Sequence, residues 1–176
     1  MHTYRFILYF LLALTTGSIF ATQEAEIPAS LKDAALHDAA CIKPDQSQNS
    51  DAPSLAALPI RVGGYERGTI ITAKGGCHCQ GANCDALVYL PFGGGYRLAL
   101  HEKYASLHPM KIVKRGMPSL TGQFEISTVK METTVYDWDG KDYRPSLCAT
   151  VTRKGRVPSI AQHPCRAAAQ VDDRAR

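Results

Sequence analysis

The stretch from residue 75 to 84, "GGCHCQGANC", places three cysteines and one histidine close together. Residues of these types support three kinds of chemistry: disulfide bonding, binding of a soft metal ion such as copper or zinc, and thiol redox chemistry. The Cys-His-Cys-x4-Cys spacing lacks the two cysteine pairs of a zinc ribbon and the downstream histidine pair of a zinc finger. A redox centre would need Cys-x-x-Cys at the start of a helix, and the surrounding glycines disfavour a helix start. The pattern therefore favours disulfides.

The alternative is an envelope metal site made of Cys77, His78 and Cys79, since adjacent Cys and His side chains suit copper or zinc. In the disulfide interpretation, His78 sits between two bridged cysteines and points at solvent. Cys77 and Cys79 would lie on one face of a strand, so we expect each to reach a distant partner rather than the other. Free-thiol counting separates the two interpretations, because a bridged cysteine offers no thiolate.

The N-terminus indicates the compartment in which these cysteines function. Residues 1–21 resemble a secretory signal, with Arg5 as the one charged side chain, an apolar run at residues 6–14, and a small polar stretch before Ala21. The apolar run is too short to span a bilayer, which takes roughly 20 residues. We expect cleavage after Ala21, with Ser18 as the alternative, and a periplasmic or secreted protein without a membrane span.

All the cysteines follow the predicted cleavage site, and an even number in an exported chain predicts a disulfide framework. We predict three disulfides, with Cys84 bonded to Cys148 and the Cys77/Cys79 pair bonded to Cys41 or Cys165. Six cysteines allow 15 connectivities, so this pairing is a hypothesis. The predicted disulfide cysteines are Cys41, Cys77, Cys79, Cys84, Cys148 and Cys165.

Composition divides the chain into four parts. Residues 1–21 are the signal, residues 22–60 an N-terminal helix and linker rich in Ala, Ser, Asp and Pro, residues 61–165 a β domain, and residues 166–176 a polar tail. The formal net charge of +4 is spread along the chain without a run of basic residues. This distribution argues against a nucleic-acid partner. We expect no cofactor.

The elements that must position the cysteines are one helix and several strands. "SLKDAALHDAAC" predicts a helix with Ser30 as N-cap, on which Leu31, Ala35 and Cys41 share one side. "TIITAK", "ALVYLPF" and "GGGYRLALHEKY" are β-branched, aromatic or alternating, and "GQFEISTVKMETTVYDW" supplies one long or two short strands. The residues from Phe92 to Tyr96 connect two of these strands as a hairpin. The fold class predicted is mainly β: a small antiparallel sandwich or sheet with a short N-terminal helix, braced by disulfides.

The segment "VYDWDGKDYRP", residues 135 to 145, contains the strongest turn signal. Asp139-Gly140 is typical of a two-residue hairpin turn, which would set Trp138 opposite Lys141 and Tyr136 opposite Tyr143. The aromatic side chains would then share one face, either as a core layer with Lys141 along the indole or as an exposed platform. A core layer is favoured. On the other face Asp137 would lie opposite Asp142, and this like-charge pair would be unfavourable unless Arg144 or a bound cation lay nearby. The spacing of the acidic residues does not match a calcium-binding EF-hand loop.

Known catalytic signatures are absent from the sequence, which contains no Gly-x-Ser-x-Gly, His-Glu-x-x-His or phosphate-binding loop. His101, His108, Glu102 and Asp85 are available for proton transfer, but no spacing joins them into an acid–base pair. Each is expected to be a surface residue. We therefore expect a protein that is not an enzyme.

The hairpin "YDWDGKDYRP", together with "GANCDALVYLPFGGGYRLAL" and "KRGMPSL", resembles segments of small exported bacterial β proteins similar to periplasmic lysozyme inhibitors and related immunity proteins. The resemblance covers roughly residues 76–146. It implies binding to a cell-wall hydrolase in the envelope. These inhibitors typically insert a Ser-Gly-x-x-Tyr loop into the hydrolase, and the nearest strings here, residues 93–96 and 121–124, depart from that pattern.

The sequence predicts an exported binding protein. The expected partner is an envelope protein, in particular a cell-wall hydrolase, which this protein would inhibit or against which it would confer immunity. Its contact loops would be residues 92–96 and 120–124, beside residues 138–141. The predicted partner-binding residues are Tyr96, Gln123, Trp138, Asp139, Lys141 and Tyr143.

Overall fold

The computed structural model describes residues 26–39, 53–154 and 157–165. The predicted signal, most of the predicted linker, Cys41 and the predicted tail lie outside these residues. Among the residues described, no helix is long and apolar enough to cross a membrane.

The described residues form one α-helix, one short 3₁₀ helix and ten strands. In chain order they are α1 (Ala29–Asp38), β1 (Ser54–Val62), β2 (Tyr65–Lys74), η1 (Gly76–His78), β3 (Cys79–Gln80), β4 (Asn83–Phe92), β5 (Gly95–Tyr104), β6 (Ser106–Lys114), β7 (Met117–Ser127), β8 (Lys130–Trp138), β9 (Tyr143–Lys154) and β10 (Val157–His163). The segment from Gly122 to Trp138 thus forms parts of two strands, and β1 begins before the composition change near residue 60.

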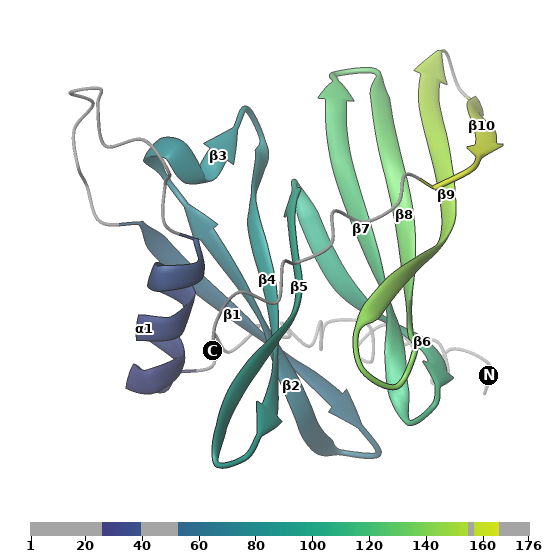
Figure 1. The fold of residues 1–176 in the computed structure, drawn as a ribbon. Helices are drawn as coiled ribbons and strands as arrows, with labels where there is room; N and C mark the ends of the chain where they lie inside the picture. Colours follow the sequence, from purple (N-terminus) through teal and green to yellow (C-terminus); the bar gives the residue numbers. More distant parts are fainter. Residues whose placement is uncertain (1–25, 40–52, 155–156, 166–176) are drawn as a thin grey trace, which may run out of the picture.

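The strands form two antiparallel five-stranded sheets, which confirms the predicted fold class (Figure 1). In the first sheet β4 is central, with β2 and the short β3 on one side and β5 on the other, and β1 forms an edge beside β2. The second sheet has the order β10-β9-β8-β7-β6. The chain passes from the first sheet to the second between β5 and β6, where the amide of Ala105 donates to the carbonyl of Gln123.

The main core lies between the two sheets, because alternate residues of each strand face the opposite sheet. Aliphatic side chains of β2 and β4 pack there against Leu120, Tyr136 and Tyr143 of the second sheet. Tyr136 is 3% exposed and Tyr143 2% exposed, so the predicted core layer is confirmed for these two rings. The hydroxyl groups of Tyr104 and Tyr136 hydrogen-bond across the core.

Helix α1 covers the outer face of the first sheet (Figure 1). Leu31 and Ala35 are buried against strand residues that include Leu87 and Tyr89, and the hydroxyl of Tyr89 donates to Asp38 at 2.8 Å. The predicted apolar side of the helix is therefore correct at Leu31 and Ala35.

The predicted N-cap is wrong. Pro28 occupies the N-cap position, no side chain caps the helix, and Ser30 lies within the first turn. Proline, with φ preset near −65°, is compatible with the start of a helix.

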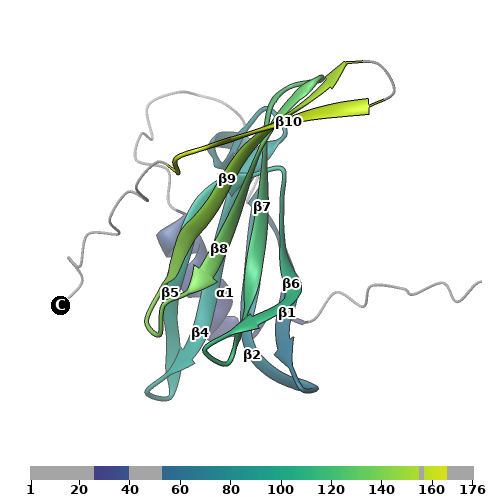
Figure 2. The ribbon, with the colours of Figure 1, turned by 90° about the vertical axis from the view of Figure 1, so that its right-hand side faces the viewer.

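Four chain reversals lie at the same end of the sandwich, which we call the hairpin end (Figures 1 and 2). They connect β1 to β2 at Gly63-Gly64, β4 to β5 at Gly93-Gly94, β6 to β7 at Arg115-Gly116, and β8 to β9 at residues 139–142. The glycines have positive φ, and so does Arg115 at 51°. These are the conformations that tight two-residue hairpins need.

The register of the β8–β9 hairpin differs from the prediction. Trp138 pairs with Tyr143 and Asp137 with Arg144, so the connection is a four-residue loop and not a two-residue turn. The reason is the Asp139 side chain, which accepts the backbone N–H groups of Lys141 and Asp142 at 2.7 and 2.8 Å. This side-chain turn replaces the backbone turn that Asp-Gly predicted.

Among the described strands, β10 is an edge strand whose one hydrogen-bonded neighbour is β9. Its side chains are exposed along almost the whole strand, including Val157 at 78% and Ile160 at 67%. Such a strand gains little from core packing.

Candidate functional site

The cysteine-rich stretch forms a small disulfide-closed hairpin. Cys79 in β3 pairs directly with Cys84 in β4 and is bonded to it, with a Cα–Cα distance of 3.9 Å. The predicted Cys84–Cys148 pair is therefore wrong, and Cys79 does not reach a distant partner. The reversal at Gly81-Ala82, where Gly81 has a φ of 62°, brings the two cysteines opposite each other.

The second described disulfide joins Cys148 in β9 to Cys165, just after β10. The proposed bond between Cys165 and the Cys77/Cys79 pair is consequently also wrong. Cys77 is disulfide-bonded as well, and none of the described cysteines is free. Disulfide bracing of the β fold is thus established for the described residues.

These bonds remove the chemistry on which the alternative metal site depended. Cys77 and Cys79 are both disulfide-bonded and offer no thiolate beside His78. In the part of the chain that the structure describes, no group of three or more His, Cys, Asp or Glu side chains could hold a metal ion.

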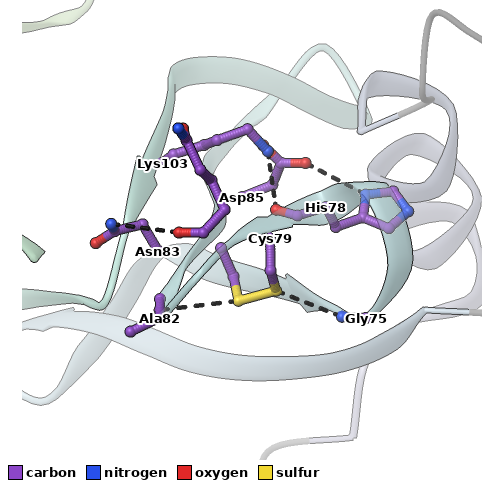
Figure 3. The surroundings of a disulfide bond; sticks show 9 residues. Gly75, His78, Cys79, Ala82, Asn83, Asp85 and Lys103 are labelled. Carbon is purple, nitrogen blue, oxygen red and sulfur yellow. Dashed lines mark hydrogen bonds and ion pairs between the residues drawn. A yellow bond between two sulfur atoms is a disulfide. The ribbon is translucent and has the colours of Figure 1, made fainter.

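His78 is buried, at 8% exposure, so the expectation that it points at solvent is wrong. Its Nδ1 lies 3.2 Å from an Asp85 carboxylate oxygen, and Lys103 donates to its backbone carbonyl at 2.8 Å (Figure 3). Asp85 is itself 6% exposed. Its other carboxylate oxygen accepts a hydrogen bond from the Lys103 ammonium at 2.8 Å and lies 3.3 Å from the Nε2 of His101. We call His78, Asp85, His101 and Lys103 the Asp85 cluster.

The Asp85 cluster corrects the expectation that Asp85 and His101 are unconnected surface residues. Burial raises the pKa of Asp85, but the hydrogen bonds and positive charges of Lys103 and His101 outweigh it and hold that pKa below its ordinary value. His108 is exposed, as expected, whereas Glu102 is half-buried and burial raises its pKa. The neighbouring Cys79 and Cys84 sulfurs are oxidised, so the cluster presents no thiol nucleophile and instead joins η1 to β4 and β5.

The loop of residues 139–142 at the hairpin end is exposed but highly ordered. Backbone N–H groups of Asp142 and Lys141 stabilise the Asp139 carboxylate, and with Arg144 they lower the pKa of Asp139 to about 2. Asp139 therefore stays ionised at any physiological pH and keeps the loop closed.

Arginines from three different elements hold this loop from outside. Arg97 of β5 donates to an Asp142 carboxylate oxygen at 2.6 Å and also to the carbonyl of Lys141. Arg115 of the β6–β7 turn donates to the carbonyl of Asp139. Arg144 of β9 reaches both Asp139 and Asp142 at 3.2 Å. We call residues 139–142 with these arginines the braced loop.

The three carboxylates of the Asp-x-Asp-Gly-x-Asp string are held separately. Asp137 receives Lys114 at 2.5 Å and the Ser119 hydroxyl at 2.6 Å, while Asp139 and Asp142 bind arginines. The predicted face with Asp137 opposite Asp142 does not form, because Asp137 pairs with Arg144 across the strands. Arg144 instead binds Asp139 and Asp142, and Lys114 binds Asp137.

Of the predicted binding residues, three lie exposed at the hairpin end: Tyr96, Asp139 and Lys141. Trp138 is half-buried against the ring of Tyr143 at 5.3 Å between ring centroids, and Arg97, rather than Lys141, lies over the indole at 6.0 Å. Tyr143 is buried and donates its hydroxyl to the carbonyl of Pro118.

Gln123 does not join this group. Residues 120–124 lie inside β7 and not in a loop, and Gln123 pairs with Ser106 and Thr133, well along the strands from residues 138–141. Its side chain accepts a hydrogen bond from the Ser106 hydroxyl at 3.3 Å. Its role is to connect β6 and β7.

Sequence reasoning did not identify the bracing role of Arg97 and Arg115, or the exposed Tyr65 at the β1–β2 turn. "VGGYE" did carry a signal, since a glycine pair is typical of a tight turn. Contact between an arginine and a loop more than forty residues away depends on strand order, which the local pattern does not contain.

The braced loop can bind a partner through a fixed set of backbone and charged groups without rearranging. The Asp85 cluster also pairs its charged groups within the structure, whereas the braced loop in addition exposes Lys141, which has no ion pair among the described residues. No protein-family model matches this chain, and no curated protein and no solved structure matches it either.

Proposed function

We propose that this protein is exported to the cell envelope and acts there by binding another protein, without catalysis, a cell-wall hydrolase being the most concrete partner. The observation that carries the proposal is the braced loop. This exposed turn is held by arginines of β5 and of the β6–β7 turn as well as by Arg144 of the adjoining β9.

The physical argument rests on the entropy of binding. Immobilising a mobile loop and its long side chains costs about 0.5–1.5 kcal/mol per side chain on association. In the braced loop Arg97, Arg144 and Asp142 are already fixed by ion pairs of 2.6–3.2 Å. Binding of a partner to the loop therefore loses little side-chain entropy, which favours tight inhibition.

The charge of the loop indicates the kind of partner. Its carboxylates are neutralised within the loop, whereas Lys141 is exposed and has no ion pair among the described residues. This basic group favours an acidic or neutral hydrolase over a basic lysozyme, since like charges slow association.

The proposal is tested by a pull-down from envelope extract followed by a wall-hydrolysis assay with and without the protein. We expect a captured hydrolase to be inhibited, and Lys141→Glu to weaken inhibition at least tenfold. Lys130→Glu, an equal charge reversal on an exposed residue at the opposite end, is the matched control and should leave inhibition unchanged. The proposal would be contradicted if Lys141→Glu and Lys130→Glu inhibited the hydrolase equally, or if the native protein inhibited no hydrolase.

A further inference from the structure

We propose that the two hairpin tips of the first sheet, residues 62–65 and 92–96, attach the protein to a bilayer surface rich in anionic phospholipids. The tips are built alike. Gly63 and Gly64 have φ values of 58° and 86°, and Gly93 and Gly94 have 56° and 83°, so both reversals are the same tight turn.

Each tip carries an aromatic side chain that the fold does not use. Tyr65 is 73% exposed and Phe92 70% exposed, immediately beside their glycine pairs, and neither belongs to a core cluster. A two-residue glycine turn needs no flanking aromatic ring for its geometry. Tyrosine is favoured at the boundary between headgroups and acyl chains because it combines an apolar ring with a polar hydroxyl, and phenylalanine is favoured on the apolar side of that boundary.

The position of the tips allows this contact. In two perpendicular views the β1–β2 and β4–β5 turns extend farther than the two turns of the second sheet (Figures 1 and 2). The tips come from hairpins of one continuous sheet, since β2 pairs with β4. A flat surface that approaches the hairpin end therefore meets the aromatic tips first.

The charge of the hairpin end complements an anionic membrane. Basic side chains in the four turns and their flanks outnumber acidic ones. The basic residues are Arg61, Arg67, Arg97, Lys111, Lys114, Arg115, Lys141 and Arg144, and the acidic residues are Glu66, Asp137, Asp139 and Asp142. Three of the four acids already bind a Lys or Arg within the structure. Arg61, Arg67 and Lys111 are exposed and have no ion pair among the described residues, so they are available to lipid phosphates.

The test is flotation with vesicles, independent of any hydrolase. The protein is recovered from the cell fraction where it accumulates and its N-terminus is sequenced, because the apolar run at residues 6–14 would itself bind lipid if retained. Vesicles of phosphatidylcholine with one-third phosphatidylglycerol are compared with pure phosphatidylcholine. We expect binding to the anionic vesicles at least tenfold stronger, weakening as salt rises.

Matched variants identify the surface that binds. Tyr65→Ser with Phe92→Ser should reduce partitioning at least tenfold, and Arg61→Gln with Arg67→Gln at least threefold. Val157→Ser with Ile160→Ser removes two equally exposed apolar side chains from β10 and should change partitioning less than twofold. Circular dichroism confirms that each variant is folded. The proposal would be overturned if the Tyr65/Phe92 variant and the Val157/Ile160 variant bound vesicles equally well, or if the native protein showed no preference for anionic vesicles.

Discussion

The ring of Tyr104 on β5 occupies the space that a side chain at Gly122 on β7 would need. A Cβ atom at Gly122 would lie 2.6–2.9 Å from three atoms of that ring, closer than van der Waals contact permits. The ring packs edge-on against Tyr136, with 6.2 Å between centroids, and the two hydroxyl groups hydrogen-bond. The absence of a side chain at position 122 therefore lets the two sheets join at this point.

Gly122→Ala is expected to lower the free energy of unfolding by about 1–3 kcal/mol, because the tyrosine ring must move and overpacking of a core has this cost. Urea denaturation followed by circular dichroism measures it. Gly95→Ala is the control, since its nearest neighbour would be 3.9 Å away and its φ is not positive. A similar loss in both variants would mean that the Tyr104 contact is not the cause.

Asp85→Asn should destabilise the fold by about 2–3 kcal/mol at pH 7, since it leaves Lys103 and two histidines without their carboxylate partner. This loss is below the roughly 3–5 kcal/mol expected for a fully buried ion pair, because Lys103 is partly exposed. Asp33→Asn, an exposed helix residue, should change stability by less than about 0.5 kcal/mol.

The stability difference between the native protein and Asp85→Asn should depend on pH. The pKa of Asp85 is lower in the folded protein than its ordinary value. The resulting stabilisation is fully present above the unfolded pKa of about 3.9 and is lost as pH falls through the folded pKa. The stability gap between the native chain and Asp85→Asn should therefore close as pH is lowered from 7 to below about 3. A gap that persists at low pH would exclude the ionised carboxylate as its source.

Peptide mapping of unreduced protein should find Cys79 linked to Cys84 and Cys148 linked to Cys165. Thiol labelling of the unfolded, unreduced protein is expected to detect no free cysteine. A Cys84–Cys148 peptide would contradict the strand register that sets Cys79 opposite Cys84.

Trp138→Ala should cost about 2–4 kcal/mol, somewhat below the loss expected for a fully buried indole, because Trp138 is only half-buried between Tyr143 and Arg97. Thermal or urea denaturation checks this value. A change within about 0.5 kcal/mol would show that the indole contributes nothing to the core and would make it a candidate for the partner surface.

The sequence was sufficient to predict those features that depend on local pattern. β-Branched and aromatic composition predicted the strand around Leu87, alternation predicted the strand around Leu100, and the triple glycine predicted the hairpin at Phe92–Tyr96. The apolar side of helix α1 followed from helical spacing at Leu31 and Ala35. In each case the residues that determine the structure lie within a few positions of one another.

The pairing of Cys79 and the register of the β8–β9 hairpin were not predicted correctly. Cys79 reaches Cys84 because a two-residue reversal at Gly81-Ala82 turns the chain back, whereas the strand pattern alone placed Cys79 beside Cys77 on one face. The β8–β9 register was wrong because Asp139 uses its side chain to close the loop. Both errors come from a local interaction that overrides the average behaviour of a dipeptide or a strand.

The Cys148–Cys165 bond also affects how two copies of this protein can interact. An edge strand that is exposed on both faces, as β10 is among the described residues, can be exchanged between identical chains. Because Cys165 follows β10 and is bonded to Cys148 in β9, the strand is closed into a covalent ring within its own chain. Exchange of β10 would require the disulfide to be opened first, so oxidation protects the protein against domain swapping at this edge.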